Sequence, residues 1–319
     1  MRNRADRKLG VLLRSGPLSS LSLLVVAISA IWLIAASRWI MSGMVVPWDS
    51  KNQFFAFFRF LAASLHAGVT PFWNPYHYGG HPSVADPQSL LFAPAFAVWA
   101  WFDSAPSMQA FDLIVHAHLL AGGIAVGIIG WRAGWPLPAS ALAAVVFMLG
   151  GPAAGRLQHT AVILSYASFP IALLFLMITL QRLSYLGALA FGIAATVLVL
   201  GRTHQSLLFC FVLAAVVLAH MMSASQPGRW LRTRAGVLLT MAAATLALST
   251  IPLLLTIQFA ALSNRPDIVI SAAHEASLYP ANLASMAAAN VMGSLETTQG
   301  YWGPNYDTLP EVGATDRSF

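Results

Sequence analysis

LSSLSLLVVAISAIWLIAASRWIM, residues 18–41, follows a basic N-terminal segment and holds a single charged residue, Arg38. A transmembrane helix needs about 20 mostly apolar residues, whereas a signal peptide has a shorter apolar region that ends at a small-residue cleavage site. This run is long enough to span a bilayer, and no clear small-x-small cleavage site ends it. The sequence therefore predicts an uncleaved first transmembrane helix.

The composition of the whole chain supports lipid as its solvent. Of 319 residues, 58% are hydrophobic and 9% are charged, whereas soluble domains carry about 25% charged residues. The net charge of +6 comes from basic residues scattered in the gaps between apolar runs, which is typical of membrane topology rather than of a nucleic-acid partner. The single cysteine, Cys210, excludes a disulfide framework and the usual cysteine-based metal motifs.

Further apolar runs predict an all-α polytopic membrane protein with about seven transmembrane helices. The expected spans are 18–41, 108–130, 137–151, 160–180, 184–201, 205–222 and 235–260. The third and fifth are short for a bilayer, so they extend further or are partly re-entrant. The run 90–102 contains Pro94 and is too short to span, so we expect an interfacial or re-entrant segment there.

The basic residues also set the orientation, because short cytoplasmic loops are enriched in them. With the N-terminus in the cytoplasm, ten of the 17 Lys and Arg fall inside: Arg2, Arg4, Arg7, Lys8, Arg14, Arg132, Arg182, Arg229, Arg232 and Arg234. Asp6 is the only acidic residue on that side, and His220 is the only one of nine His. Avoidance of acids in cytoplasmic loops does not account for the bias of the histidines. We therefore expect the residues capable of chemistry to lie on the extracytoplasmic face.

Five parts follow from this topology. They are a basic cytoplasmic N-terminus (1–17), the first transmembrane helix (18–41), a first extracytoplasmic loop with interfacial helices (42–107), a bundle of six further transmembrane helices (108–260) and an extracytoplasmic segment (261–319). Both outer segments are too long to be simple connections between helices. The last stretch, 296–319, is polar and has no helix after it, so we expect a truncated chain.

The first outer loop opens with a predicted amphipathic helix within residues 44–68, lying in the membrane interface. Asp49 or Ser50 would begin it, and Gly68 would end it. Two interpretations of Asp49 stay open. It caps the helix, which is worth about 1 kcal/mol, or it is placed at the membrane surface to accept a proton or hold a cation.

PFWNPYHYGGHPSVADPQS, residues 71–89, follows this helix and is rich in Pro and Gly, which exclude a regular helix. Its aromatic residues favour the membrane interface. Together with neighbouring amide, imidazole and carboxylate groups they also supply what a sugar or polar head-group site needs. His77 and His81 have the spacing of a metal pair on a helix, but Gly79 and Gly80 argue against a helix and hence against zinc.

WDSKNQ (48–53), followed by PFWNPYHYGGHPSVADPQSLLFAP (71–94), resembles the first outer loop of the bacterial YfhO-like membrane protein family. Weaker similarities are GRLQHT (155–160), GRTHQS (201–206) and YWGPNY (301–306). The family is similar to the GT-C superfamily of polytopic glycosyltransferases, and its members are usually considerably longer than this chain. The resemblance implies a GT-C-like fold in the bacterial cytoplasmic (inner) membrane.

The same resemblance implies a hexosyltransferase-type enzyme that takes a sugar from a polyprenyl-phosphate donor and transfers it to a cell-envelope glycan or lipid acceptor. Asp49 would be the general base or bind a divalent cation, with Asp86 as the second catalytic candidate. Many members of the superfamily have two adjacent acids where this chain has Asp49 alone, which argues against a tightly held metal. The implied substrate-binding residues are Gln53, Trp73, Asn74, Tyr76, His81, Gln88, Arg156, His159, Arg202, His204 and Gln205.

Two Arg/His/Gln clusters recur at the outer ends of later helices, around residues 156–159 and 202–205. Each arginine could simply reach toward lipid head groups. Because the cluster occurs twice, it also suits a phosphate group facing one outer cavity.

A transporter is the alternative class, with Asp112, His116 and His118 as a proton relay within the second span. These residues could equally be buried polar groups satisfied by helix neighbours. The polar content of the chain lies mainly in long loops on one side, which favours surface chemistry. A non-catalytic membrane fragment is a third interpretation.

Overall fold

The computed structural model describes residues 18–201, 204–263, 280–288 and 291–293, and over these residues the chain is helical without a β-strand. It divides into two units, Met1–Phe259 and Ala260–Phe319. Among its described residues, the second unit holds the last two residues of α11 (Pro227–Ala261) and two short elements, η3 (Pro280–Leu283) and α13 (Ala284–Ala287). The predicted basic N-terminus, Arg202 and YWGPNY lie outside the described residues.

Among the described residues, six helices are long and apolar enough to cross a membrane, which by length and composition confirms an all-α, multi-pass membrane protein. They are α2 (Leu18–Met41), α5 (Met108–Arg132), the stretch formed by α6 (Leu137–Leu149) and α7 (Gly151–Ala154), α8 (Thr160–Arg182), α10 (His204–Met222) and α11 (Pro227–Ala261). The expected fifth span is α9 (Tyr185–Leu200), a shorter apolar helix of 16 residues.

Two expected spans differ from the helices observed. The third is interrupted at Gly150, whose extended backbone (φ −72°, ψ 170°) separates α6 from α7. The last begins earlier than expected, at Pro227, because proline is well tolerated in the first turn of a helix. The sequence pattern missed this start since Arg229, Arg232 and Arg234 make the first turns polar.

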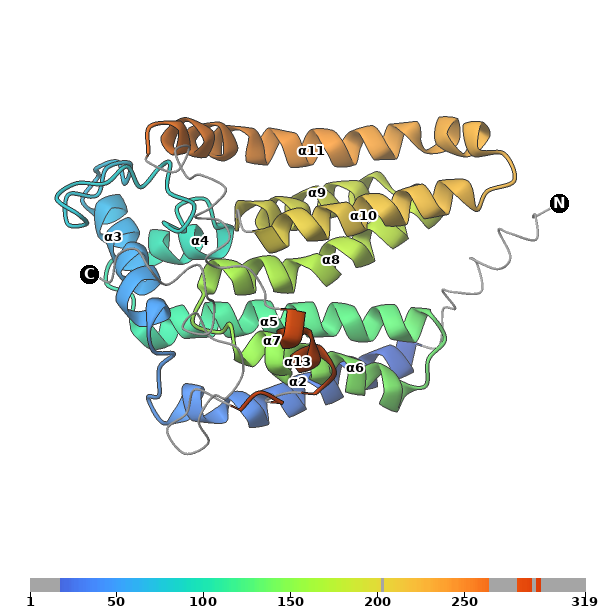
Figure 1. Ribbon diagram of the computed structural model, residues 1–319, viewed down its shortest axis with the longest axis horizontal. Helices are drawn as coiled ribbons and strands as arrows, with labels where there is room; N and C mark the ends of the chain where they lie inside the picture. The colour runs from blue at the N-terminus through green and yellow to red at the C-terminus, as the bar shows by residue number, and fades with distance from the viewer. Residues whose placement is uncertain (1–17, 202–203, 264–279, 289–290, 294–319) are drawn as a thin grey trace. The chain divides into compact units, whose positions relative to one another are not determined.

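In the first half of the bundle, α5 packs against three other helices, α2, α6 and α8 (Figure 1). Leu24, Ile28 and Trp32 of α2 enter an apolar core with Trp131 of α5. Gly127 permits this contact, because a Cβ at that position would lie 2.5 Å from Cδ1 of Ile28. Small residues at such crossings are how helices associate in lipid.

A second core joins α8, α9, α10 and α11. Leu176 and Leu180 of α8 are fully buried in it, and Trp230 and Val237 of α11 pack there. Arg234 donates from Nε to the carbonyl oxygen of Leu180 at 3.0 Å. That bond satisfies one of the free carbonyl groups near the end of α8.

The helix expected within residues 44–68 is present as two parts, a π-helical turn η1 (Ser50–Phe54) and α3 (Phe55–His66), while its predicted place in the membrane interface stays a prediction. It stops where Gly68 adopts φ +68°, as its glycine predicted. Its apolar face packs inside the protein, where Phe58 is fully buried against Phe96 of α4 (Pro94–Phe102) and Phe111 of α5. The run 90–102 is therefore partly helical and helps to cover the end of α5.

Candidate functional site

Asp49 stands where the chain leaves the first span and enters η1. Its neighbour Trp48 has φ +61°, a left-handed conformation that is uncommon outside glycine. Asp49 occupies the N-cap position of η1, yet its side chain makes no capping hydrogen bond. Helix capping therefore does not account for this carboxylate, which is about half exposed at 52%.

His159, which is far from Asp49 in the sequence, lies next to it in the fold. Its Nε2 lies 3.6 Å from Oδ2 of Asp49, within reach of an ion pair but beyond a hydrogen bond. The residue sits directly before α8, and its backbone N–H donates to the carbonyl of Arg156 at 2.8 Å in a tight turn. Nδ1 of His159 is buried and has no hydrogen-bond partner among the described residues. The pair brings an acid and a base together from two connections that are far apart in the sequence.

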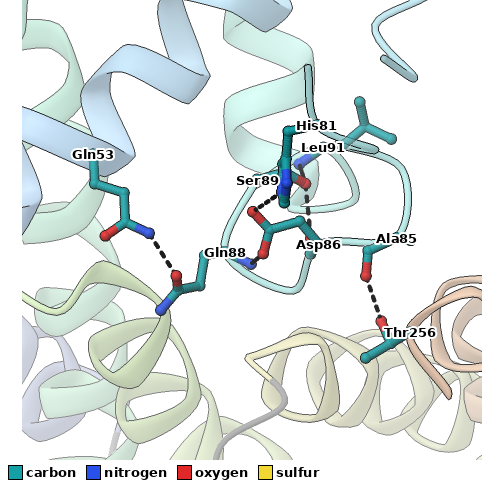
Figure 2. Close-up of polar contacts among 8 residues, drawn as sticks. All are labelled: Gln53, His81, Ala85, Asp86, Gln88, Ser89, Leu91 and Thr256. Atoms are coloured by element: carbon teal, nitrogen blue, oxygen red, sulfur yellow. Dashed lines mark hydrogen bonds and ion pairs between the residues drawn. The ribbon is translucent and has the colours of Figure 1, made fainter. Parts of the chain in front are cut away.

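Gln53 and Gln88 connect Asp49 to the second acidic residue. Nε2 of Gln53, one turn along from Asp49, donates to Oε1 of Gln88 (Figure 2). The backbone N–H of Gln88 in turn donates to Oδ1 of Asp86 at 2.8 Å. The structure thus joins the two sequence motifs of the first loop, residues 48–53 and 71–89, through a pair of amides.

Both carboxylate oxygens of Asp86 are occupied by its own loop. Oδ1 accepts from Gln88, and Oδ2 lies 2.9 Å from Nε2 of His81 (Figure 2). Oγ of Ser89 donates to the Asp86 carbonyl at 2.9 Å. The residue is buried, with a relative exposure of 8%. These contacts make Asp86 a group that fixes the loop, unlike the exposed Asp49.

The proline- and glycine-rich loop has a defined internal structure. Asn74 and His81 form an isolated antiparallel bridge, with N–H to carbonyl distances of 2.8 and 2.9 Å. The side-chain oxygen of Asn74 accepts from the backbone N–H of Tyr76 at 3.0 Å. Gly80 has φ +126°, and a Cβ there would lie 2.6 Å from the ring of Trp73. Asn74 is therefore buried in the loop scaffold, and only glycine fits beneath Trp73.

The long helix α11 also contacts this loop. Oγ1 of Thr256 donates to the carbonyl of Ala85 at 3.0 Å (Figure 2). The ring of Phe259 meets that of His81 edge to face, with centroids 5.6 Å apart. The loop 71–89 is thus held by α11 through Ala85 and His81, and by η1 through Gln88.

Aromatic side chains form the outer surface of the loop. Tyr76 and Tyr78 are 87% and 88% exposed, and Trp73 and Trp48 are also exposed. Of the predicted substrate-binding residues, Trp73 and Tyr76 therefore present open ring faces. Asn74 does not, because it is buried.

The predicted phosphate-binding residues are only partly accounted for. Arg156 is exposed on the turn that carries His159. His204 is exposed and Gln205 half-buried at the start of α10, while their neighbour Arg202 lies outside the described residues. Within the part of the chain described, no hydrogen bond or ion pair joins His204 or Gln205 to Asp49, and the common cavity of the two clusters stays a prediction.

Part of the GRTHQS motif has a packing role. Oγ of Ser206 lies 3.0 Å from Oγ of Ser165, which also donates to the Leu198 carbonyl at 2.9 Å. Gly201 lies against the same serine, since a Cβ there would be 1.8 Å from Oγ of Ser165. Gly201 and Ser206 of the motif therefore pack the junction of α9 and α10 against Ser165 of α8.

Among the described residues, too few ligands lie at Asp49 to hold a divalent cation. One carboxylate and one imidazole lie together, and the described residues contain no group of three or more His, Cys, Asp or Glu that could hold a metal ion. His77 and His81 pack with ring centroids 5.4 Å apart, but they too form no such group.

The ionisable residues within α5 face two directions. Oδ2 of Asp112 accepts from the backbone N–H of Val46 at 2.9 Å. His116 lies on the same face against Trp32 and Trp39 of α2, with ring centroids 5.8 and 5.1 Å apart. His118 instead lines a pocket formed with α8 and α9. The three residues therefore do not share one cavity, and the predicted three-membered relay is not a continuous chain.

The sequence motifs indicate candidate residues of the site but not which of them lie in contact. His159 came from the recurrent GRLQHT and GRTHQS motifs, and nothing in the sequence indicated that it faces Asp49. The bond between Gln53 and Gln88 was likewise not predicted, although both lie in the motifs that suggested the family.

No protein-family model matches this chain, and neither a curated protein nor a solved structure shows significant similarity to it. Membership of the YfhO-like family therefore stays a prediction.

Proposed function

We propose that this protein is a membrane glycosyltransferase of the GT-C type that acts at the extracytoplasmic face of the bacterial inner membrane. The donor is a polyprenyl-phosphate-linked sugar, and the acceptor is a cell-envelope glycan or lipid. The observation that carries the proposal is the contact between Asp49, near the start of the predicted first outer loop (42–107), and His159. An exposed carboxylate beside an imidazole, bordered by exposed aromatic rings, suits proton transfer on a sugar substrate.

In this reaction the acceptor hydroxyl attacks the anomeric carbon of the donor sugar. Asp49 takes the hydroxyl proton, the new carbon–oxygen bond forms, and the bond from the anomeric carbon to the phosphate oxygen breaks. The lipid phosphate leaves with that electron pair, so no strong general acid is needed. His159 orients the Asp49 carboxylate, and the guanidinium group of Arg156 offsets the charge that develops on the phosphate.

The remaining loop residues position rather than react. The buried Asp86 holds His81 and the Gln88 backbone, and Gln88 holds Gln53 on the turn that follows Asp49. The exposed rings of Trp73 and Tyr76 stack on the sugar or the acceptor. This division assigns proton transfer to Asp49 alone.

The test is complementation of a deletion strain with the full protein, followed by profiling of cell-envelope glycans and polyprenyl-phosphate sugars. Asp49→Asn is expected to leave the glycan missing and the lipid-linked sugar accumulated, at normal membrane levels of the protein. Asp103→Asn is the matched control, because Asp103 lies in the same loop and contacts only Trp99 and Ala105 among the described residues. Full complementation by Asp49→Asn would remove Asp49 from the mechanism, and a deletion strain with unchanged glycans and lipid-linked sugars would refute the proposed function.

Proton-coupled transport is the second candidate, favoured by two buried polar atoms within α5. Oδ1 of Asp112 and Nε2 of His116 have no hydrogen-bond partner among the described residues. Ionisable groups at such positions often serve proton transfer. Loss of substrate uptake into vesicles in Asp112→Asn or His116→Gln, with normal glycans, would support this function instead.

A further inference from the structure

A pocket opens within the membrane-spanning part of the chain, between α5, α8 and α9. Its volume is about 420 Å³, within the usual range for small-molecule sites. It lies apart from Asp49 and has no part in the proposed sugar transfer. Ala117 and Ala121 of α5 and Ile193 of α9 line it and are exposed, so it opens toward the surrounding hydrocarbon.

The wall of the pocket is apolar except for two side chains, His118 of α5 and Ser168 of α8. The depth of His118 follows from its place in α5, about 15 Å along the axis from Met108 at 1.5 Å per residue. A charged head group at this depth is costly. The ligand that fits such a wall is therefore uncharged and mostly hydrocarbon.

The hydrogen bonding of His118 indicates which polar group a ligand of this pocket should carry. Nδ1 lies 2.8 Å from the carbonyl oxygen of Ile114, so this nitrogen carries the hydrogen and donates it. In the neutral imidazole Nε2 is then an acceptor. Within the described part of the chain, the bond to Ile114 is the one hydrogen bond of this imidazole. An acceptor without a donor in hydrocarbon is unfavourable, and a hydroxyl group would satisfy it.

We propose that this pocket binds an uncharged apolar alcohol dissolved in the membrane, whose hydroxyl donates to Nε2 of His118. The hydroxyl of Ser168, on a nearly fully buried side chain, offers a second polar partner for the same oxygen. The small side chains of Ala117, Ala121 and Ala194 leave the space for the alkyl chain.

The experiment uses the full chain in lipid nanodiscs and a photoreactive analogue of 1-dodecanol. Labelled peptides are identified by mass spectrometry and competed with 1-dodecanol or with its methyl ether, which lacks the donor. We expect labelling on α5, α8 and α9, and about fivefold weaker competition by the ether, the usual size of one neutral hydrogen bond. His118→Leu should remove this difference, and His118→Gln should restore it because its amide oxygen accepts.

A second pair of variants tests the location. Ala190→Phe fills the pocket and should abolish labelling, whereas Leu186→Phe is one turn away on the exposed surface of α9 and should not change it. Equal competition by alcohol and ether, or labelling that persists in Ala190→Phe, would overturn the proposal and leave a groove that takes any lipid chain. These readouts do not involve sugar transfer, so they are independent of the proposed function.

Discussion

The carboxylate of Asp112, buried in α5, accepts a hydrogen bond from the backbone N–H of Val46 across 66 residues of sequence. Val46 is itself buried, and it lies on the short segment that links α2 to Trp48 and Asp49. Among the described residues, this is the one hydrogen bond that residues 43–47 make. Asp112 therefore anchors the segment that presents Asp49.

Replacing Asp112 separates its role as an acceptor from its role as a charge. Asp112→Leu leaves the buried N–H of Val46 without a partner and should lower the free energy of unfolding by about 1–3 kcal/mol. Asp112→Asn keeps a carbonyl oxygen for this bond and should change stability little. Reaction of a thiol-sensitive dye with Cys210, the only cysteine and half-buried in α10, reports thermal unfolding in detergent. Equal destabilisation by both variants would show that the charge matters rather than the bond.

The contacts of Asp86 make a prediction about the order of the first loop. Asp86→Ala removes the acceptor for the Gln88 N–H and the partner of His81, so the bridge between Asn74 and His81 should open more often. Amide hydrogen exchange of residues 72–93 should speed up by about tenfold or more, corresponding to roughly 1.4 kcal/mol of lost local stability. Asp103→Ala serves as the control, and unchanged exchange in Asp86→Ala would refute a scaffold role.

The sequence predicted the helices well because lipid imposes a simple rule, about 20 apolar residues for each span. The predicted helix boundaries were wrong where the chain departs from this rule. Gly150 divides the third span, and the arginines of the first turns of α11 concealed its start at Pro227. The packing of Phe58 into a protein core, rather than into the membrane interface, could not be predicted either, because an amphipathic pattern is the same in both environments.

For the candidate site, the sequence predicts candidate residues but not the contacts between them. Asp49 and Gln53 were selected by family resemblance, as were Asp86 and Gln88. Which of them lie together depends on loop conformations such as φ +61° at Trp48, which no residue pattern encodes. The pairing of Asp49 with His159 also depends on how α5 and α8 pack, a long-range property.

The close contact of Gly201 with Ser165 predicts a coupled pair. A Cβ at residue 201 would lie 1.8 Å from Oγ of Ser165 and 2.8 Å from the carbonyl oxygen of Ala161. Gly201→Ala should therefore destabilise the protein by about 1–3 kcal/mol, the usual effect of overpacking. Adding Ser165→Gly removes the nearest atoms, so the double variant should lose less than the sum of the single changes. Thermal unfolding of the four proteins measures the coupling, and strict additivity would contradict this contact.

The orientation of the chain predicts which side of the membrane each loop reaches. In a Cys210→Ala background, Tyr76→Cys places a thiol on an 87% exposed site of the first outer loop. Gln226→Cys places one on the exposed connection between α10 and α11, where the arginines of the first turns of α11 favour the cytoplasm. A membrane-impermeant maleimide added to intact spheroplasts should label Tyr76→Cys and leave Gln226→Cys unlabelled. Both should react once the membrane is permeabilised, which confirms that each thiol is accessible. The reverse pattern in intact cells would place the Asp49–His159 contact in the cytoplasm and exclude a reaction at the outer face.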